Sequence, residues 1–170
     1  MAKQEIEKLI SSWKEDSKYN DKLGYLFLNV YLPEQYVKKI NDFLIRDNTF
    51  FTDLIIDMEF AYITLNQLSD YDFPSIYSLS GAKKEIKKIE AQSKYKDNDN
   101  YYAVPIPLQV EELDAISEML KLERQIDDSI TFDDLFVKFI DCYEKIDPRL
   151  LQYLQEEVCE EINEDIRKQH

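Results

Sequence analysis

Apolar residues recur at helical spacing along most of the chain, and this pattern predicts a mainly α-helical protein. Residues 3–14 form one short amphipathic helix. A second helix starts after Pro33, because proline is tolerated at the first position of a helix. Asn48 or Thr49 supplies a cap for a third helix, whose apolar stripe extends over 51–65.

The same periodicity predicts further helices in the second half of the chain. A lysine-rich helix covers 82–95, and another helix covers 109–126. Thr131, with an acid three residues later, has the spacing of a capping box that opens the next helix. Asp147 is followed by proline, which predicts a sharp start for the last helix, 148–168. The last two helices are expected to form an antiparallel C-terminal hairpin.

Two stretches fit a strand as well as a helix. Helix is favoured for 23–31, and 54–65 has the length of a helix rather than a strand. The two prolines near 101–106 exclude a regular helix there and favour extended backbone. The expected fold class is therefore mainly α, a single multi-helix domain with six or seven helices. The alternative is an α+β fold with a small sheet formed by 25–31 and 101–106.

Length and charge restrict the class of protein. The 170 residues suit one domain, 1–170, and any subdivision is expected near 96–107. The chain has 35 acidic and 21 basic residues, a formal net charge of −14. This charge repels nucleic acid and anionic lipid, and it favours a basic protein as partner. The N-terminus lacks the layout of a signal peptide, and no apolar run approaches the roughly 18 residues of a membrane span. We therefore expect a cytoplasmic protein that contacts no membrane.

Few catalytic chemistries fit this composition. The single histidine, His170, is terminal, which excludes histidine-based nucleophile systems and the usual general base. Only 2 Gly occur, so neither common phosphate-binding loop is present. Zinc sites need about four Cys or His ligands, and Cys142 and Cys159 are too few. We expect no enzyme activity, no cofactor and no metal.

Two carboxylate patterns have some features of metal sites. Residues 97–108 begin like a calcium loop, with Asp97 and Asp99, but they lack its glycine and its closing glutamate. An asparagine-rich turn is the better interpretation. A carboxylate-metal enzyme is the third functional alternative, and its residues would be Asp70, Asp72 and the pair Glu85 and Lys87. Against it, Glu85 and Lys87 are two residues apart on a helix and point to different faces.

Residues 154–166 hold six carboxylates and no base. On a helical wheel these carboxylates lie opposite an apolar stripe that includes Leu150 and Leu151. Like charges four residues apart destabilise a helix by about 0.2–0.5 kcal/mol per pair, so solvation alone does not explain the missing counter-charge well. Charged blocks are nevertheless often only solvated surface, which keeps plain solvation ahead of partner binding as the interpretation of this segment. Residues 111–170 contain 18 acids and 7 bases, a net charge of −11, whereas 1–110 contain 17 acids and 14 bases, a net charge of −3. The predicted partner-binding residues are Glu156, Glu157, Glu160, Glu161, Glu164 and Asp165.

These observations predict a non-enzymatic binding protein whose acidic surface blocks a basic, nucleic-acid-binding site on a partner such as a nuclease. Inhibitors, immunity proteins and phage counter-defence proteins have this design, in which carboxylates stand in for phosphates. The composition, rich in Lys, Ile, Asn, Glu and Tyr, is typical of an AT-rich bacterial or phage genome. The main alternative is a self-associating structural or regulatory subunit, in which a basic strip meets the acidic helices of another copy. The strip consists of Lys83, Lys84, Lys87 and Lys88, for which an ordinary solvated face is the simpler interpretation.

Overall fold

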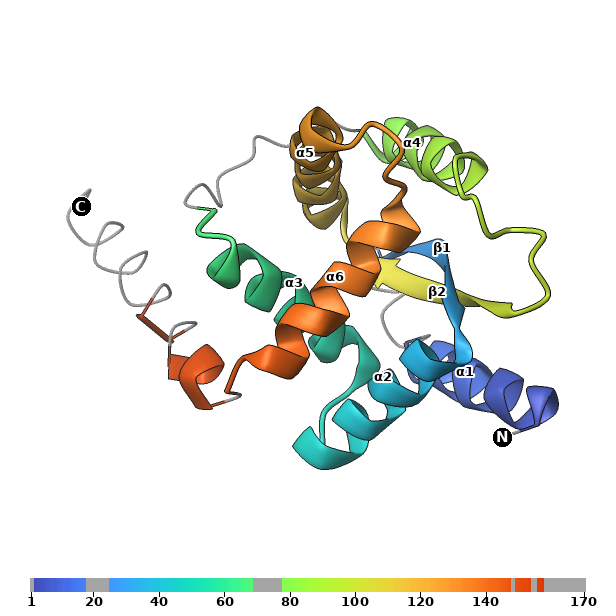
Figure 1. Ribbon diagram of the computed structural model, residues 1–170, viewed down its shortest axis with the longest axis vertical. Coiled ribbons are helices and arrows are strands. Elements are labelled where there is room, and N and C mark those ends of the chain that lie inside the picture. Colours follow the sequence, from blue (N-terminus) through green and yellow to red (C-terminus); the bar gives the residue numbers. More distant parts are fainter. Residues whose placement is uncertain (1, 18–24, 69–77, 148, 154–155, 158–170) are drawn as a thin grey trace.

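The computed structural model describes residues 2–17, 25–68, 78–147, 149–153 and 156–157. These residues form a mainly α-helical fold with a small antiparallel sheet (Figure 1). A further helical stretch begins at residue 149. The elements in chain order are α1 (Lys3–Ser17), β1 (Leu26–Pro33), α2 (Glu34–Asp47), α3 (Phe51–Leu65), α4 (Leu79–Ala91), β2 (Tyr101–Leu108), α5 (Val110–Ile126) and α6 (Phe132–Lys145).

The two strands pair along their whole length although they are far apart in sequence. The register runs from Leu26 opposite Leu108 to Pro33 opposite Tyr101. The helix favoured for 23–31 is therefore wrong, and the alternative sheet is confirmed. The residues of β1 fit both helical and alternating patterns, and the alternating one is realised because the proline-rich strand β2 supplies a partner. The side chains of β1 that reach the core are Leu28, Val30 and Leu32.

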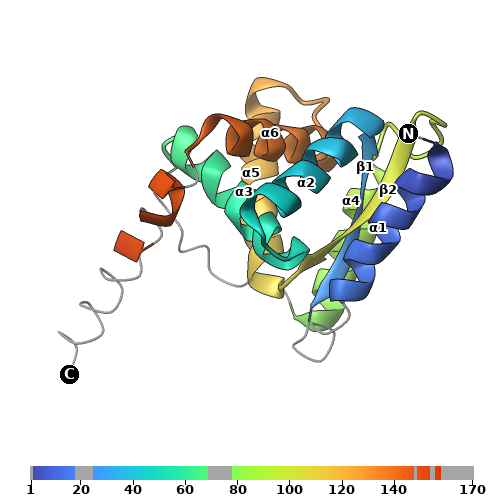
Figure 2. The same ribbon diagram turned by 90° about the horizontal axis from the view of Figure 1, so that it is seen from below.

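Both edges of this small sheet have features that limit further pairing. At the free edge of β1, the backbone N–H of Asn29 donates to Glu90 of α4 at 2.9 Å, and that of Tyr31 donates to Asp133 of α6 at 2.7 Å. Pro105 lies opposite Asn29 in the register, so its nitrogen faces the free edge of β2. Proline has no N–H to leave unpaired, and α1 packs beside this strand (Figure 2).

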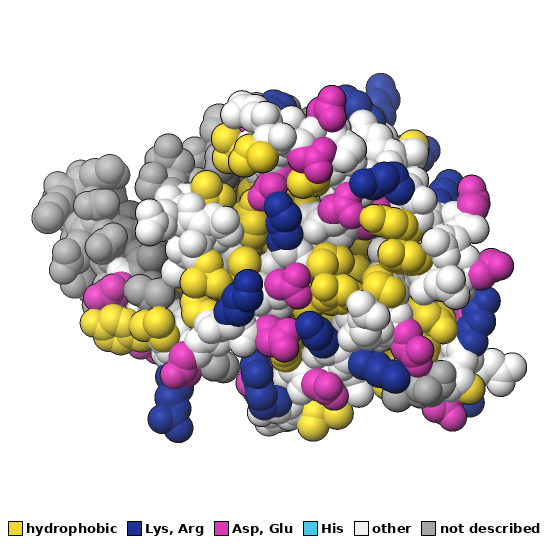
Figure 3. All heavy atoms as spheres, viewed as in Figure 1, with side chains coloured by type: hydrophobic (Ala, Val, Ile, Leu, Met, Phe, Trp, Pro, Cys, Tyr) yellow, Lys and Arg dark blue, Asp and Glu magenta, His cyan; other side chains and the backbone are white. Residues whose placement is uncertain are grey.

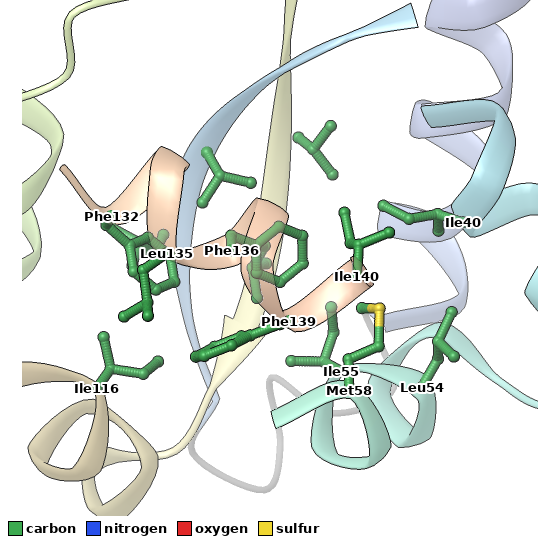
Figure 4. Packing of buried hydrophobic residues seen from close by; sticks show 14 of the residues in the cluster. Ile40, Leu54, Ile55, Met58, Ile116, Phe132, Leu135, Phe136, Phe139 and Ile140 are labelled. Atoms are coloured by element: carbon green, nitrogen blue, oxygen red, sulfur yellow. The ribbon is translucent and has the colours of Figure 1, made fainter. Parts of the chain in front are cut away.

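One hydrophobic core joins all eight elements. Helix α6 crosses its centre, and Phe136 and Phe139 are each 1% exposed. In Figure 4 they lie between the sheet and the apolar faces of α3 and α5. The ring of Phe139 packs 5.0 Å from that of Tyr62, centroid to centroid. That the chain is one domain, 1–170, stays a prediction.

The helix ends test the predicted caps. Neither Asn48 nor Thr49 caps α3, so that prediction is wrong; Asn48 ends α2 with a left-handed backbone (φ 47°), which asparagine adopts more readily than most residues. The capping box is confirmed, because the Thr131 N–H donates to the Asp134 carboxylate at 3.0 Å. The cap at Asp147 is also confirmed, since its carboxylate accepts the N–H of Arg149 at 2.9 Å.

Candidate functional site

The predicted acidic surface begins at the C-terminal end of the described chain. Glu156 and Glu157 are exposed, and Gln152 Nε2 donates to Glu156 Oε1 at 3.3 Å. Leu151 is 3% exposed and joins the core, as the helical wheel predicts. Leu150, which the wheel places in the same stripe, is 51% exposed, so the apolar stripe is only partly buried here. The other predicted partner-binding residues, Glu160, Glu161, Glu164 and Asp165, lie outside the described residues.

Three basic residues of α5 and α6 have partners within the fold. Lys121 pairs with Glu118 at 3.1 Å, and Lys138 pairs with Glu123 at 2.6 Å. Arg124 donates through Nε to the Ile130 carbonyl at 3.0 Å. These cations are therefore committed to nearby acceptors. On the face shown in Figure 3, acidic and basic side chains are intermixed.

The predicted basic strip lies on the outer side of α4. Lys83, Lys84, Lys87 and Lys88 are all exposed, and no ion pair joins them to another described residue. The opposite side of the helix is buried through Ala82, Ile86 and Ile89. The helix starts at Leu79, three residues before the predicted boundary, because Ser78 caps it by accepting the Gly81 N–H at 3.1 Å.

Three groups of one tyrosine, one carboxylate and one base hold α6 against its neighbours. In the first, Glu123 of α5 accepts hydrogen bonds from Tyr62 of α3 and Lys138 of α6. Burial opposes the charge of Glu123, but these two donors outweigh it, so the pKa of its carboxyl is lowered. The group therefore links three helices through one charged side chain.

The second group joins α6 to α2. Asp47 accepts two hydrogen bonds from the Arg46 guanidinium, each at 2.8 Å, and one from the Tyr143 hydroxyl of α6. The Arg46 bonds lower the pKa of Asp47 despite its partial burial. In the third group, Tyr95 and Lys94 donate to Asp134 at 3.0 and 3.1 Å. In all three groups the carboxylate is engaged in hydrogen bonds that fix α6 in the fold.

Sequence reasoning missed a buried carboxyl on α3, Glu59, and a half-buried one on α5, Glu112, whose charge affects it. Glu59 is 8% exposed, and burial, together with the charge of Glu112, raises its pKa to about 8. Burial also raises the pKa of Glu112 to about 7, with a smaller contribution from Glu111. The sequence held a signal for this site, because Glu59 lies one turn from Ile55 and one turn from Ile63 on the apolar side of its helix.

A second missed site lies on the other side of α5. Asp114 is 2% exposed and Ser117 is 8% exposed, and neither the carboxylate nor the hydroxyl has a hydrogen-bond partner within the described part of the chain. They are one turn apart, on the same side of the helix as Arg124, which contacts Gln92 beyond α4. Glu112 faces away from them, so the buried acids of α5 do not converge on one point.

The described residues do not bring together the ligands of a metal site. No three His, Cys, Asp or Glu side chains among them are close enough to hold a metal ion. Asp70 and Asp72 lie outside the described residues, and Glu85 is half-buried on α4. Asp97 and Asp99 belong to the turn before β2, together with Asn98, whose side chain accepts the Asn100 N–H at 2.9 Å.

Comparisons with known proteins add no family or fold relationship. No family model, curated protein or solved structure matches this chain. Within the described ranges, no helix is both long and apolar enough to cross a membrane. The candidate sites therefore stand on their own geometry and charge.

Proposed function

We propose that this protein is a non-enzymatic binding protein whose acidic C-terminal surface occupies a basic site on a partner protein. One observation carries the proposal: between residues 111 and 157 the chain has 14 acids and 5 bases, a net charge of −9. Three of those bases have partners within the fold: Lys121, Arg124 and Lys138. The exposed Glu156 and Glu157 extend this acidic stretch beyond α6.

Exposed apolar side chains beside these acids support an interface. Leu150 is 51% exposed and Tyr153 is 58% exposed, and they precede Glu156 and Glu157 by one to two turns. Interfaces combine apolar and aromatic anchors, which contribute most of the affinity, with a charged surround that directs association. A surface made only for solvation has no need of an exposed leucine and tyrosine next to its charges.

The charge pattern indicates which class of protein would bind this surface. Carboxylates spaced along one surface reproduce the negative field of a phosphate backbone, and they attract a groove that binds nucleic acid. We therefore assign the partner to the nucleic-acid-binding proteins, nucleases included, and the protein to the cytoplasmic inhibitors of the immunity or phage counter-defence type. Blocking such a groove requires no catalytic group.

Affinity capture from a bacterial lysate tests this proposal, with two variants of equal charge. Glu156, Glu160 and Glu164 are replaced by Lys in the first variant. The control carries Glu5→Lys, Glu7→Lys and Glu15→Lys on α1, all exposed positions. Each variant changes the net charge from −14 to −8, so only the location of the change differs.

The expected result is a nucleic-acid-binding protein that the wild type and the α1 control both capture and that the C-terminal variant loses. Added salt should weaken the capture, because attraction between exposed charges is screened. Equal capture by all three proteins, or capture lost equally in both variants, would show that the C-terminal carboxylates do not form the interface.

A further inference from the structure

Two side chains of α5 are polar and buried, and they have no hydrogen-bond partner among the described residues. Asp114 is 2% exposed, and Ser117 is 8% exposed. Both carboxylate oxygens of Asp114 and the hydroxyl oxygen of Ser117 lack a partner within the described ranges. Burying a carboxylate is costly unless it is paired and hydrogen-bonded, so a bound group with several hydrogen-bond donors would be strongly favoured beside Asp114.

The two side chains are placed to contact one group together. They are three residues apart on α5, which puts them on the same side of the helix with their Cβ atoms about 5–6 Å apart. They are not hydrogen-bonded to each other, and Ser117 does not donate to a carbonyl of the preceding turn, as a serine within a helix often does. Both groups are therefore available to the same ligand.

The oxygens of this pair fit an organic cation better than a metal ion. Calcium and magnesium take about six or more oxygen ligands, and no three His, Cys, Asp or Glu side chains in the described part of the chain are close enough to hold a metal ion. An ammonium group has three N–H donors, which match the two carboxylate oxygens and the hydroxyl oxygen. A guanidinium group has five donors, so two of them would stay buried without an acceptor.

We propose that Asp114 and Ser117 bind the ammonium group of an aliphatic primary amine inside the fold. Leu113 and Leu120 lie one turn to either side of Ser117, and both are buried. The methylene chain of an amine can pack against such apolar side chains while its charged end stays bonded to the carboxylate. The net charge of −14 also raises the local concentration of cations around the protein.

The way α5 is held gives such a ligand a route to the buried pair. The side-chain hydrogen bonds from α5 to other described parts of the chain lie near its C-terminal end, at Glu123 and Arg124. Asp114 and Ser117 are about two turns earlier. No side-chain hydrogen bond between described residues ties 110–117 to another helix or strand. Local opening of this end of α5 therefore admits the amine without global unfolding.

Thermal unfolding of the full chain with n-butylamine hydrochloride tests the proposal, because a ligand that binds only the folded state raises Tm. The ionic strength is kept constant. Potassium and tetramethylammonium chloride are the ligand controls, since both cations carry one charge and no N–H donor. The protein variants are Asp114→Asn, Ser117→Ala and, as the matched control, Glu111→Gln, which removes one carboxylate charge at an exposed position of the same helix.

n-Butylamine should raise the Tm of the wild type and of Glu111→Gln, whereas the two control cations should not. Its dissociation constant should be weaker by about thirtyfold or more in Asp114→Asn, which loses the buried charge pair. Ser117→Ala should weaken it by about tenfold, because one hydrogen bond from the ammonium group is lost. No rise of the wild-type Tm, an equal rise in Asp114→Asn, or an equal rise with potassium overturns the proposal.

Asp114→Asn without any amine gives a second test that does not depend on the chosen ligand. Asparagine has a similar shape and no charge, and a buried neutral group costs less than a buried charge. The variant should therefore have a higher Tm than the wild type. A lower Tm would show that the fold itself already provides a partner for the carboxylate, and it would overturn the proposal.

The ammonium group can belong to a free amine or to a lysine side chain of another protein. Nα-acetyl-lysine N-methylamide carries the same group on a peptide backbone. Tighter binding of n-butylamine would assign the site to a free amine, and tighter binding of the lysine derivative would assign it to a protein lysine. Asp114→Asn should still capture the basic partner, because the C-terminal carboxylates are intact, so this inference and the proposed function fail in different experiments.

Discussion

Glu59→Gln should make the protein more stable at neutral and alkaline pH. Glu59 is 8% exposed between the isoleucines of α3, and burial raises the pKa of its carboxyl from 4.5 to about 8. The folded state therefore keeps a proton that the unfolded state releases above about pH 4.5. The contribution of this group to stability is fully present below that pH, and it is lost as the pH rises through about 8.

The size of the effect follows from the shift of the Glu59 pKa. A rise from 4.5 to about 8 corresponds to about 5 kcal/mol between acid and alkaline pH, at about 1.4 kcal/mol per pH unit. About 3 kcal/mol of this is already lost at pH 7, and about 1–1.5 kcal/mol more between pH 7 and pH 9. Glutamine has a similar shape and never ionises, so the variant should lose this pH dependence.

Urea unfolding from pH 5 to pH 9 measures the effect. The wild type should lose stability relative to Glu59→Gln as the pH rises, with the widest gap at pH 9. Glu7→Gln, the same change at an exposed position of α1, should follow the wild type at every pH. Parallel curves for the wild type and Glu59→Gln, or a Glu59→Gln variant that is the less stable protein at pH 9, would refute this reasoning.

The packing around α6 gives three further predictions, each measured by urea unfolding. Tyr143→Phe removes the hydroxyl that donates to Asp47, and it should cost about 1.5–3 kcal/mol near neutral pH, since the lost bond is to a charged group. Lys138→Met should cost about 1 kcal/mol at pH 7. That cost should become smaller as the pH falls below about 4. The pKa of Glu123 is lowered in the folded state, so the ionised carboxylate stabilises the fold above the ordinary carboxyl pKa, and this stabilisation is lost in acid. Phe139→Ala should cost about 3–5 kcal/mol, since it empties the centre of the core, and a cost below about 1 kcal/mol would contradict the packing described.

The helices were predictable because each one carries its own periodic signal. The stripe of α3 and the capping box of α6 are local patterns, and both appear where the sequence places them. The strand β1 was not decided by its own residues, because they fit both a helix and a strand. Its partner β2 begins 75 residues later, and no local pattern specifies that pairing. In that region only Pro105 and Pro107 of β2 indicated an extended backbone.

Some of the candidate sites could be predicted from a local sequence pattern, and others depend on contacts between residues far apart in the sequence. The exposed lysine strip follows directly from the helical wheel of α4. The pKa of Glu59 depends on Glu112, which lies on a different helix 53 residues later, so its value could not be read from the sequence. The buried side of α3 still marked Glu59 as unusual, because a carboxylate between two isoleucines at four-residue spacing must either be paired or hold a proton.

Competition between this protein and nucleic acid for the captured partner tests the central proposal most directly. A fluorescent duplex bound to that partner is titrated with the wild type, with the C-terminal charge-reversal variant and with the α1 control. We predict that the wild type and the α1 control displace the duplex, and that the variant with Lys at Glu156, Glu160 and Glu164 does not. A ternary complex in which the partner holds both the duplex and the wild type would show that the acidic surface does not occupy the nucleic-acid-binding site.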